Sequence, residues 1–492
     1  MVFFAGIDLG STGIRGIVAD SAGRVILNIQ EVIPPDKLYM ECENPPGWHE
    51  QDPRSWVETF YQLLTKLVGG LKKLGLSLEE MKAICTDSTS GTIIAVNEKG
   101  NPLTSAIMYN DIRAQEEAQI VQDAAEEFSQ KVGYKFKASF SLPKMLWIMR
   151  HLPSIFKQTY KILHANDFIV GLLTGEYFHS DTSNCLKAGF DFINGQWPSL
   201  IERVGIPLEK LPEVVFSGQK VGRTSEKLEK ITGFPSNVLV ISGATDSTMA
   251  LIASGASKEG DFFSSLGTTL VTRCLTRELV LDPQGRVYCH VLPGSRRMFL
   301  PGGASSVGAE CLQTYFPNID YKLYDKKALE NFPTQAITYP LVKKGERFPF
   351  VNSNAKHFYE GPEDNNYEKY AAYLQAVAFV ERLSIQVLES LGAKSGGRVF
   401  TIGGATKSKE WLQIRADVLQ KQIIRPKIIE AAYGAAILAA CTVVYDGNLT
   451  ETIEKFVSPD LIIQPRVKLR DKIEEYYENF LSEITKRFQV QI

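Results

Sequence analysis

A chain of 492 residues is long enough for about two to four domains, and its 44% apolar and 22% charged residues are typical of a globular protein with a large core. Its 54 Lys and Arg nearly balance 56 Asp and Glu, which argues against a nucleic acid or an anionic membrane surface as the main partner. Seven scattered cysteines without a C-x-x-C pair argue against a disulfide framework or a metal cluster. Because no long apolar segment or signal sequence is present, we expect a soluble, cytoplasmic protein that binds neither membrane nor nucleic acid.

The N-terminal residues predict three short strands, over 2–7, 14–19 and 25–31. The first two are joined by the string D-L-G-S-T-G-I-R at 8–15. Backbone N–H groups and hydroxyls in such a turn can hold a phosphate, and Asp8 can hold a divalent cation beside it. An ordinary polar turn with a satisfied Asp explains the string equally well.

Two polar segments of the first half follow apolar strands. A strand over 81–85 runs into T-D-S-T-S-G-T at 86–92, and the string Y-N-D-I-R at 109–113 opens a helix. A strand end that delivers several polar residues at once is what a small polar ligand needs. A capped helix start explains Asn110 or Asp111, but not the whole group.

In the second half, a strand over 238–242 delivers the string G-A-T-D-S-T, which leads into a helix. Asp246 therefore lies between a strand end and a helix N-terminus, where an ionised carboxylate is stabilised and can accept a proton. An Asp of ordinary pKa, about 3.9, is ionised at neutral pH. A plain helix N-cap explains Asp246 as well, and the residue can serve both roles.

The arrangement strand, Gly-Thr turn, strand recurs at 262–274, and further Gly-rich turns follow strands at 302–306 and 403–406. This recurrence predicts two similar α/β halves with a boundary near residue 240, followed by a C-terminal helix over 469–488. Open α/β sheets bind ligands at the carboxyl ends of their strands, so these turns are expected to converge on one crevice. Neither a P-loop nor a dinucleotide fingerprint is present.

Taken together, these strings resemble the motifs of the FGGY carbohydrate kinases, which belong to the actin-like ATPase superfamily. Residues 8–15 resemble D-x-G-T-x-S-x-R, with Ser11 for Thr and Gly13 for Ser. The other strings that resemble family motifs are G-W-H-E-Q-D-P at 47–53, P-K-M-L-W-I at 143–148, L-T-G-E at 173–176, G-E-R-x-P at 345–349 and, after Gly403 and Gly404, W-x-Q-x-x-A-D at 411–417. The resemblance covers nearly the whole chain, from Asp8 to about Ala440.

The resemblance implies an α/β fold of two RNase H-like (actin-like ATPase) domains with a cleft between them. We expect an N-terminal domain over 1–241 with the sugar site and the first phosphate turn, a C-terminal domain over 242–445 with the ATP site, and a helical extension over 446–492. The implied reaction transfers the γ-phosphate of ATP to a sugar hydroxyl, with ATP and Mg²⁺ as cofactors. The expected assembly is a monomer or a homodimer.

The resemblance also implies roles for single residues. Asp246 is the expected catalytic base, and Asp8 the expected Mg²⁺ ligand. The expected nucleotide contacts are Ser11, Thr12, Gly267, Thr268 and Thr269 at the phosphates, together with Gly303, Gly403, Gly404, Ala405, Ser408 and Trp411.

The acceptor is expected to be a ketopentose. The string at 109–113 resembles the family's W-N-D-x-R, so Asp111 and Arg113 are expected to bind sugar hydroxyls. Ser88, Thr89 and Ser90 stand where xylulose kinases carry Q-M-H, and the string T-S-G-T at 89–92 looks more like D-ribulose kinase-like members. We therefore expect these residues and Asp246 to contact D-ribulose, ahead of D-xylulose or another polyol.

Two alternatives from other classes are an actin-like ATPase without a sugar acceptor and a sugar-binding protein without kinase activity. The polar residues Ser90 and Asp111 argue for an acceptor pocket. The presence of both Asp8 and Asp246 argues for catalysis.

Overall fold

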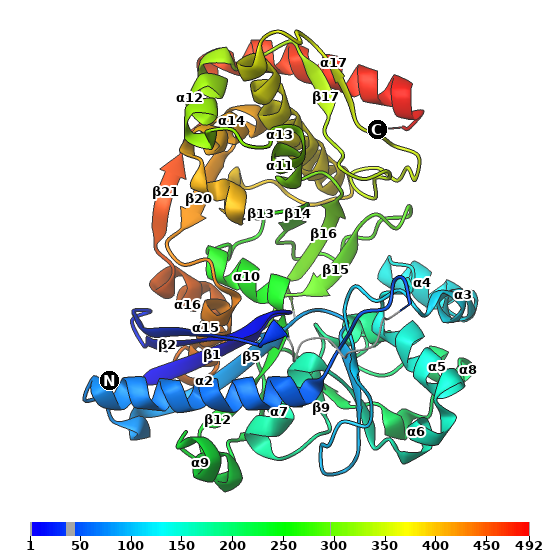
Figure 1. Cartoon of the computed structure of the whole chain (residues 1–492), viewed down its shortest axis with the longest axis vertical. Coiled ribbons are helices and arrows are strands. Elements are labelled where there is room, and N and C mark those ends of the chain that lie inside the picture. The colour runs from blue at the N-terminus through cyan, green and yellow to red at the C-terminus, as the bar shows by residue number, and fades with distance from the viewer. Residues whose placement is uncertain (1, 36–44, 296, 492) are drawn as a thin grey trace. The chain divides into compact units, whose positions relative to one another are not determined.

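The computed structural model describes residues 2–35, 45–295 and 297–491, which form two compact units (Figure 1). The first unit comprises Met1–Ala253, His290–Arg297 and Glu430–Val457, and the second comprises Ser254–Cys289, Met298–Ile429 and Ser458–Ile492. These bounds differ from the predicted ones. The first unit continues past residue 241, and it also includes helix α15 (Ala431–Val444), which packs on its sheet.

The first unit is built on a six-stranded sheet in the order β11-β12-β5-β1-β2-β3. Its three central strands are parallel, while β2, β3 and β11 run antiparallel to their neighbours. The predicted N-terminal hairpins are confirmed. The strands are β1 (Phe3–Leu9), β2 (Gly13–Asp20), β3 (Val25–Val32), β5 (Met81–Ser88), β11 (Lys220–Arg223) and β12 (Leu239–Thr245).

Helices cover both faces of this sheet. Helix α2 (Pro53–Lys73) begins after Asp52, whose side chain accepts the Arg54 N–H as an N-cap, and it packs on β2 and β3. Helix α15 packs on β1 and β5 through small residues. A Cβ atom on Gly6 would lie 1.8 Å from the Ala432 carbonyl oxygen, so only glycine permits this close approach.

The second unit repeats the sheet of the first. Its order is β15-β16-β14-β13-β19-β20-β21, and from β16 to β21 the strand directions follow the same sequence as from β3 to β11. The predicted internal repeat is therefore confirmed. The strands are β13 (Phe262–Leu266), β14 (Leu270–Cys274), β15 (Tyr288–Val291), β16 (Phe299–Ser305), β19 (Arg398–Ile402), β20 (Gln422–Pro426) and β21 (Pro459–Ile463). The last two residues of β15 fall within the bounds given for the first unit.

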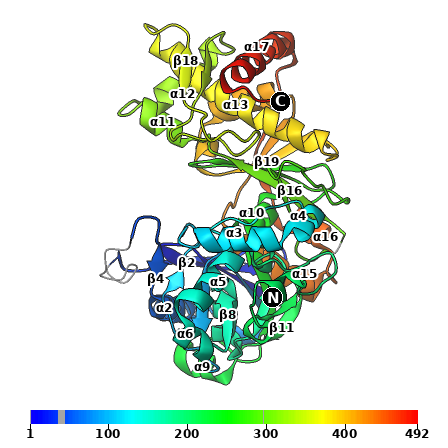
Figure 2. The same ribbon diagram turned by 90° about the vertical axis from the view of Figure 1, so that its right-hand side faces the viewer.

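Two long helices of the second unit, α13 (Asn366–Ser390) and α17 (Arg470–Phe488), contact each other through their side chains (Figure 2). Arg382 of α13 pairs with Glu474 of α17 at 2.6 Å, and its guanidinium stacks 4.0 Å from the Tyr477 ring centre. Helix α17 confirms the predicted C-terminal helix. The sequence did not predict α13, because it is buried around most of its circumference and therefore lacks a polar stripe.

The remaining elements are the strands of three smaller sheets and further helices. In the first unit they are β4 (Glu50–Gln51), β6 (Ile93–Val96), β7 (Ala106–Ile107), β8 (Lys161–His164), β9 (His179–Asp181), β10 (Glu213–Val215), α3 (Gln115–Ala124), α4 (Glu126–Val132), α5 (Ser141–His151), α6 (Pro153–Gln158), α7 (Ala165–Thr174), α8 (Leu200–Arg203), α9 (Glu226–Thr232), α10 (Asp246–Ser254) and α16 (Leu449–Phe456). In the second unit they are α11 (Glu310–Tyr315), α12 (Tyr321–Asn331), β17 (Ile337–Tyr339), β18 (Phe358–Glu360) and α14 (Lys409–Leu419).

Within the described ranges, no helix combines the length and the apolar character needed to cross a bilayer. Six cysteines in these ranges are buried free thiols, and Cys42 lies outside the described residues.

The close packing of α15 on β1 predicts a strong effect of Gly6→Ala. The added methyl group would overlap the backbone of α15, so we expect the free energy of unfolding to fall by about 3 kcal/mol or more. Gly69→Ala is the matched control, because a Cβ there meets nothing within 4 Å and a helical Ala should gain about 0.5 to 1 kcal/mol. Denaturant unfolding followed by circular dichroism measures both, and equal stability of the two variants would contradict this packing.

Candidate active site

Three aspartates lie at the carboxyl ends of the adjacent parallel strands β12, β5 and β1. Asp8 and Asp87 are register partners, and Ala244 is the partner of Asp87 on the other side. Asp246 follows two residues after Ala244 as the first residue of α10. Register partners on parallel strands direct their side chains to the same face of the sheet, so the carboxyl groups of Asp8 and Asp87 share one face. Asp246 lies near enough for its charge to act on both.

A local irregularity precedes Asp246. The register of β12 against β5 shifts between Ile241 and Ala244, and a Cβ atom on Gly243 would lie 1.6 Å from the Thr86 carbonyl oxygen. Bulges of this kind redirect the side chains that follow them. Gly243 thus allows the end of β12 to approach β5 closely enough to bring Asp246 to the other two aspartates.

The three carboxyl groups influence one another electrostatically. Burial, and then the negative charge of Asp246, raises the pKa of Asp8 to about 6. Burial, and then the charges of Asp8 and Asp246, raises the pKa of Asp87 well above its ordinary value. Asp87 is only 1% exposed, and neither of its carboxylate oxygens has a partner that meets hydrogen-bond geometry among the described residues.

The sequence places Asp87 in a polar string and predicts no role for it. A signal was available, because Asp87, like Asp8, lies at the carboxyl end of a buried strand. What the sequence could not supply is the register that makes the two residues neighbours.

The predicted phosphate turn lies between β1 and β2. The Gly10 N–H donates to the Gly13 carbonyl at 3.0 Å, the Ile33 N–H donates to the Thr12 carbonyl, and the Gln51 amide donates to the Ser11 carbonyl at 2.7 Å. The hydroxyls of Ser11 and Thr12 have no hydrogen-bond partner in the described part of the chain, and Thr12 is exposed. The turn is held by its carbonyls, which leaves donors for a ligand.

Asp111 and Arg113 form a buried ion pair rather than an open polar pair. The Arg113 guanidinium contacts Asp111 at 2.7 Å and Glu50 at 2.6 Å, and it lies 3.8 Å above the Trp48 ring. Asp111 is fully buried and also accepts the His49 N–H. The protein itself satisfies both side chains, so they fix the 109–113 loop, and their predicted contact with a sugar stays a prediction.

Two lysines donate hydrogen bonds to the other predicted acceptor loop, residues 88–92. Lys144, which is fully buried, donates to the carbonyls of Gly91 at 3.0 Å and Met108 at 2.6 Å, and Lys187 donates to the Ser90 carbonyl at 3.0 Å. Burial lowers the pKa of Lys144 to about 7. The sequence predicts no role for either lysine, although Lys144 lies within the P-K-M-L-W-I string.

The hydroxyl groups of residues 88–92 differ in their hydrogen bonding. Thr89 shares a 2.8 Å hydrogen bond with Thr92, while the hydroxyl of Ser88 is buried without a partner among the described residues. A buried hydroxyl without a partner is costly, which suggests that a ligand or a water supplies one.

In the second unit, the turn from Gly267 to Thr269 occupies the place of the phosphate turn in the repeat, and Thr268 is exposed.

The two glycines after β19 differ in the space around them. Gly403 has φ of +101°, and a Cβ there would lie 2.4 Å from the Leu266 carbonyl oxygen. Around Gly404, in contrast, nothing lies within 4 Å of an added Cβ. Backbone can therefore approach a ligand closely at Gly404.

The other predicted nucleotide residues lie deeper. Ala405 is 8% and Trp411 is 2% exposed, and the Trp411 indole donates to the Leu374 carbonyl at 3.1 Å. Ser408 is the N-cap of α14, and Gly303 packs against the Phe348 ring. Trp411 and Gly303 are thus core positions, and their predicted contacts with the nucleotide stay predictions.

A Mg²⁺ ion needs only one or two carboxylates from a protein, because waters and phosphates complete its shell. Asp8, with the buried carboxylate of Asp87 beside it, fits this requirement. No set of three or more His, Cys, Asp or Glu side chains among the described residues is placed to hold a metal by itself.

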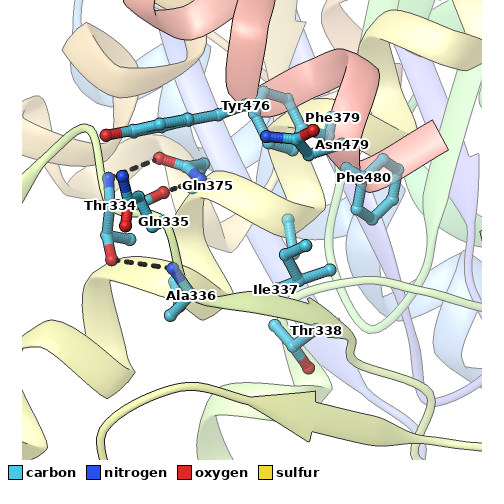
Figure 3. A pocket seen from close by; sticks show the side chains of 12 residues that line it. Thr334, Gln335, Ala336, Ile337, Thr338, Gln375, Phe379, Tyr476, Asn479 and Phe480 are labelled. Carbon is cyan, nitrogen blue, oxygen red and sulfur yellow. Dashed lines mark hydrogen bonds between the residues drawn. The ribbon is translucent and has the colours of Figure 1, made fainter. Parts of the chain in front are cut away.

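A small pocket lies in the second unit, and none of the predicted site residues lines it (Figure 3). Its lining comes from residues 334–338, α13 and α17, and its free space of about 10 Å³ is roughly that of one water molecule. The buried Gln375 side chain closes one end, where it pairs with both the N–H and the carbonyl of Thr334. The pocket is too small for a sugar or a nucleotide.

Comparisons with known proteins agree with this geometry. The model of the N-terminal domain of the FGGY family of carbohydrate kinases matches residues 3–253, and that of the C-terminal domain matches residues 263–443. The xylulose kinase of Staphylococcus epidermidis is 26% identical over 480 residues, which cover 96% of this chain and 94% of that protein. The xylulose kinase of Bacillus subtilis is 25% identical over 494 residues, with 97% and 96% covered.

Solved structures show the same fold. The crystal structure of xylulose kinase from Rhodospirillum rubrum aligns with a TM-score of 0.86 at 23% identity and covers 98% of both chains. The duplicated sheet, with a turn after the first strand of each copy, thus defines an actin-like ATPase fold. The chain belongs to the FGGY family of carbohydrate kinases, and it is a sugar kinase.

The raised pKa of Asp8 predicts how stability depends on pH. Because the folded protein holds this proton up to about pH 6 and the unfolded chain only to about 3.8, the free energy of unfolding should fall between these values as pH rises. Asp8→Asn removes the effect, so relative to wild type the variant should gain up to about 3 kcal/mol at pH 7.5 and little at pH 4. Denaturant unfolding at both pH values measures this gain, and a difference that does not change with pH would refute the electrostatic assignment.

Proposed function

We propose that the protein transfers the γ-phosphate of ATP to a hydroxyl group of a ketopentose, with D-xylulose as the leading acceptor. The observation that carries the proposal is the position of Asp246, which lies at the N-terminus of α10 with Asp8 and Asp87 on the adjacent strand ends. Support for the acceptor comes from relatives that match nearly the whole chain and are named xylulose kinases.

Asp246 acts in this proposal as the general base. One of its carboxylate oxygens accepts the Ser247 N–H at 2.7 Å, which orients the group. Phosphoryl transfer depends mostly on positioning and charge neutralisation, so the carboxylate has only to align the acceptor hydroxyl and take its proton. The helix N-terminus stabilises the ionised form that this role requires.

Asp8 is the proposed Mg²⁺ ligand, and the ion would neutralise charge on the phosphates. Ser11 and Thr12 are proposed to donate to phosphate oxygens, because their hydroxyls have no partner in the described part of the chain. In the second unit, the turn from Gly267 to Thr269 is proposed to bind phosphate. The other proposed nucleotide contacts there are Gly303, Gly403, Gly404, Ala405, Ser408 and Trp411.

D-ribulose is the second candidate acceptor. The sequence favoured it, because Ser88, Thr89 and Ser90 replace the residues of xylulose kinases, and the buried Ser88 hydroxyl without a described partner is consistent with a different sugar contact. The names of the relatives favour D-xylulose, so we reverse the expected order of the two sugars.

An acceptor screen tests the proposal. Purified protein with ATP and Mg²⁺ is offered D-xylulose, D-ribulose, L-ribulose, xylitol and gluconate, and ADP release is measured against a reaction without acceptor. We expect D-xylulose to give the highest kcat/KM. Hydrolysis of ATP that no acceptor accelerates would refute the proposal and favour an actin-like ATPase without a sugar acceptor.

Asp246→Asn tests the base assignment. Since the amide cannot accept the proton, acceptor-dependent ADP release should fall at least about 1,000-fold while the circular dichroism spectrum is unchanged. Asp364→Asn, at an exposed position of the second unit, is the control and should keep wild-type activity. A kcat for Asp246→Asn within tenfold of wild type would exclude this residue as the base.

A further inference from the structure

The side chain of Gln51 links the phosphate turn to the core of the first unit. Its amide nitrogen donates to the Ser11 carbonyl at 2.7 Å, and its amide oxygen accepts the Trp56 indole N–H at 3.0 Å. Gln51 is 3% and Trp56 is 1% exposed, so both hydrogen bonds are shielded from water. The backbone of Gln51 is fixed as well, because it pairs with Ala106 in the β4–β7 ladder.

This link determines the orientation of one peptide group. The peptide between Ser11 and Thr12 is planar, and its C=O and N–H point in opposite directions. Since Gln51 holds the C=O toward the core, the Thr12 N–H must point the other way. No described residue accepts a hydrogen bond from this N–H, and Thr12 is exposed.

We propose that Gln51 is a positioning residue for phosphoryl transfer, which keeps the Thr12 N–H directed at a phosphate oxygen of the nucleotide. The inference rests on the proposed function, because it takes the 10–13 turn as a phosphate site. Without the amide donor, the peptide is free to rotate, and the Ser11 carbonyl can turn its negative end toward the phosphate. Gln51 itself touches neither substrate.

The same segment is connected to the predicted acceptor loop. Glu50 pairs with Arg113 at 2.6 Å, and the His49 N–H donates to the Asp111 carboxylate. Residues 49–51 therefore hold both the phosphate turn and the 109–113 loop, but through different side chains. A change confined to the Gln51 amide should disturb the nucleotide and leave the acceptor nearly unaffected.

The experiment uses Gln51→Met, which keeps the length of the side chain and removes both the oxygen and the nitrogen of the amide. We expect kcat/KM for ATP to fall about 10- to 100-fold and KM for the pentulose to stay within twofold of wild type. The dissociation constant of a fluorescent ATP analogue, measured without sugar, should rise by a similar factor.

The matched control is Gln375→Met in the second unit. Gln375 is 2% exposed, and its amide also makes two buried hydrogen bonds, both to the backbone of Thr334 (Figure 3). We expect it to lower the thermal unfolding temperature about as much as Gln51→Met, without changing either KM.

The outcomes separate this inference from the proposed function. A wild-type protein that phosphorylates no pentulose refutes the function. An active wild type with unchanged nucleotide affinity in Gln51→Met refutes the positioning role, and so does an equal loss for both substrates. If Gln51→Met does not fold, Gln51→Glu replaces it, because a carboxylate offers no donor to the Ser11 carbonyl, and the same affinities decide.

Discussion

The first unit must hold three mutually repelling carboxyl groups close together. Asp8, Asp87 and Asp246 end adjacent parallel strands, so the sheet holds them together whatever their charge. Burial and like charges raise the pKa of Asp8 to about 6 and that of Asp87 well above its ordinary value, which means that folding costs free energy here at neutral pH. A site that favours a cation or a proton in this way is typical of function rather than stability.

The loops around this site are fixed by buried polar contacts rather than by apolar packing. Lys144 joins the Gly91 and Met108 carbonyls, Arg113 joins Asp111 to Glu50, and Gln51 joins Ser11 to Trp56. Each of these groups would be costly to leave unpaired, so each loop has one favoured position. This rigidity leaves the remaining hydroxyls and N–H groups in place for a ligand.

The sequence predicted the local features of this molecule well. The hairpin of β1 and β2, the N-cap Asp52, the repeat at β13 and β14 and the helix α17 all depend on patterns within a few residues. It could not predict features that depend on distant pairing. The role of Asp87 follows from the register of β1 against β5, and the burial of Arg113 follows from Trp48 and Glu50, over 60 residues earlier. The unit bounds also depend on such pairing, because α15 returns to a sheet formed early in the chain.

The two copies of the sheet share a backbone arrangement but carry different side chains at their strand ends. Leu9 and Leu266 end the first strand of each copy, so Ser265 in the second unit stands where Asp8 stands in the first. Ser265 pairs with Ile402, and Asp8 with Asp87, so the equivalent pair in the second unit carries no acid. Both copies offer a Gly- and Thr-containing turn, but a neutral strand end can approach an anionic nucleotide without repulsion. The duplicated backbone thus supplies a Gly- and Thr-containing turn twice, and the difference at two positions confines this pair of acidic residues to the first unit.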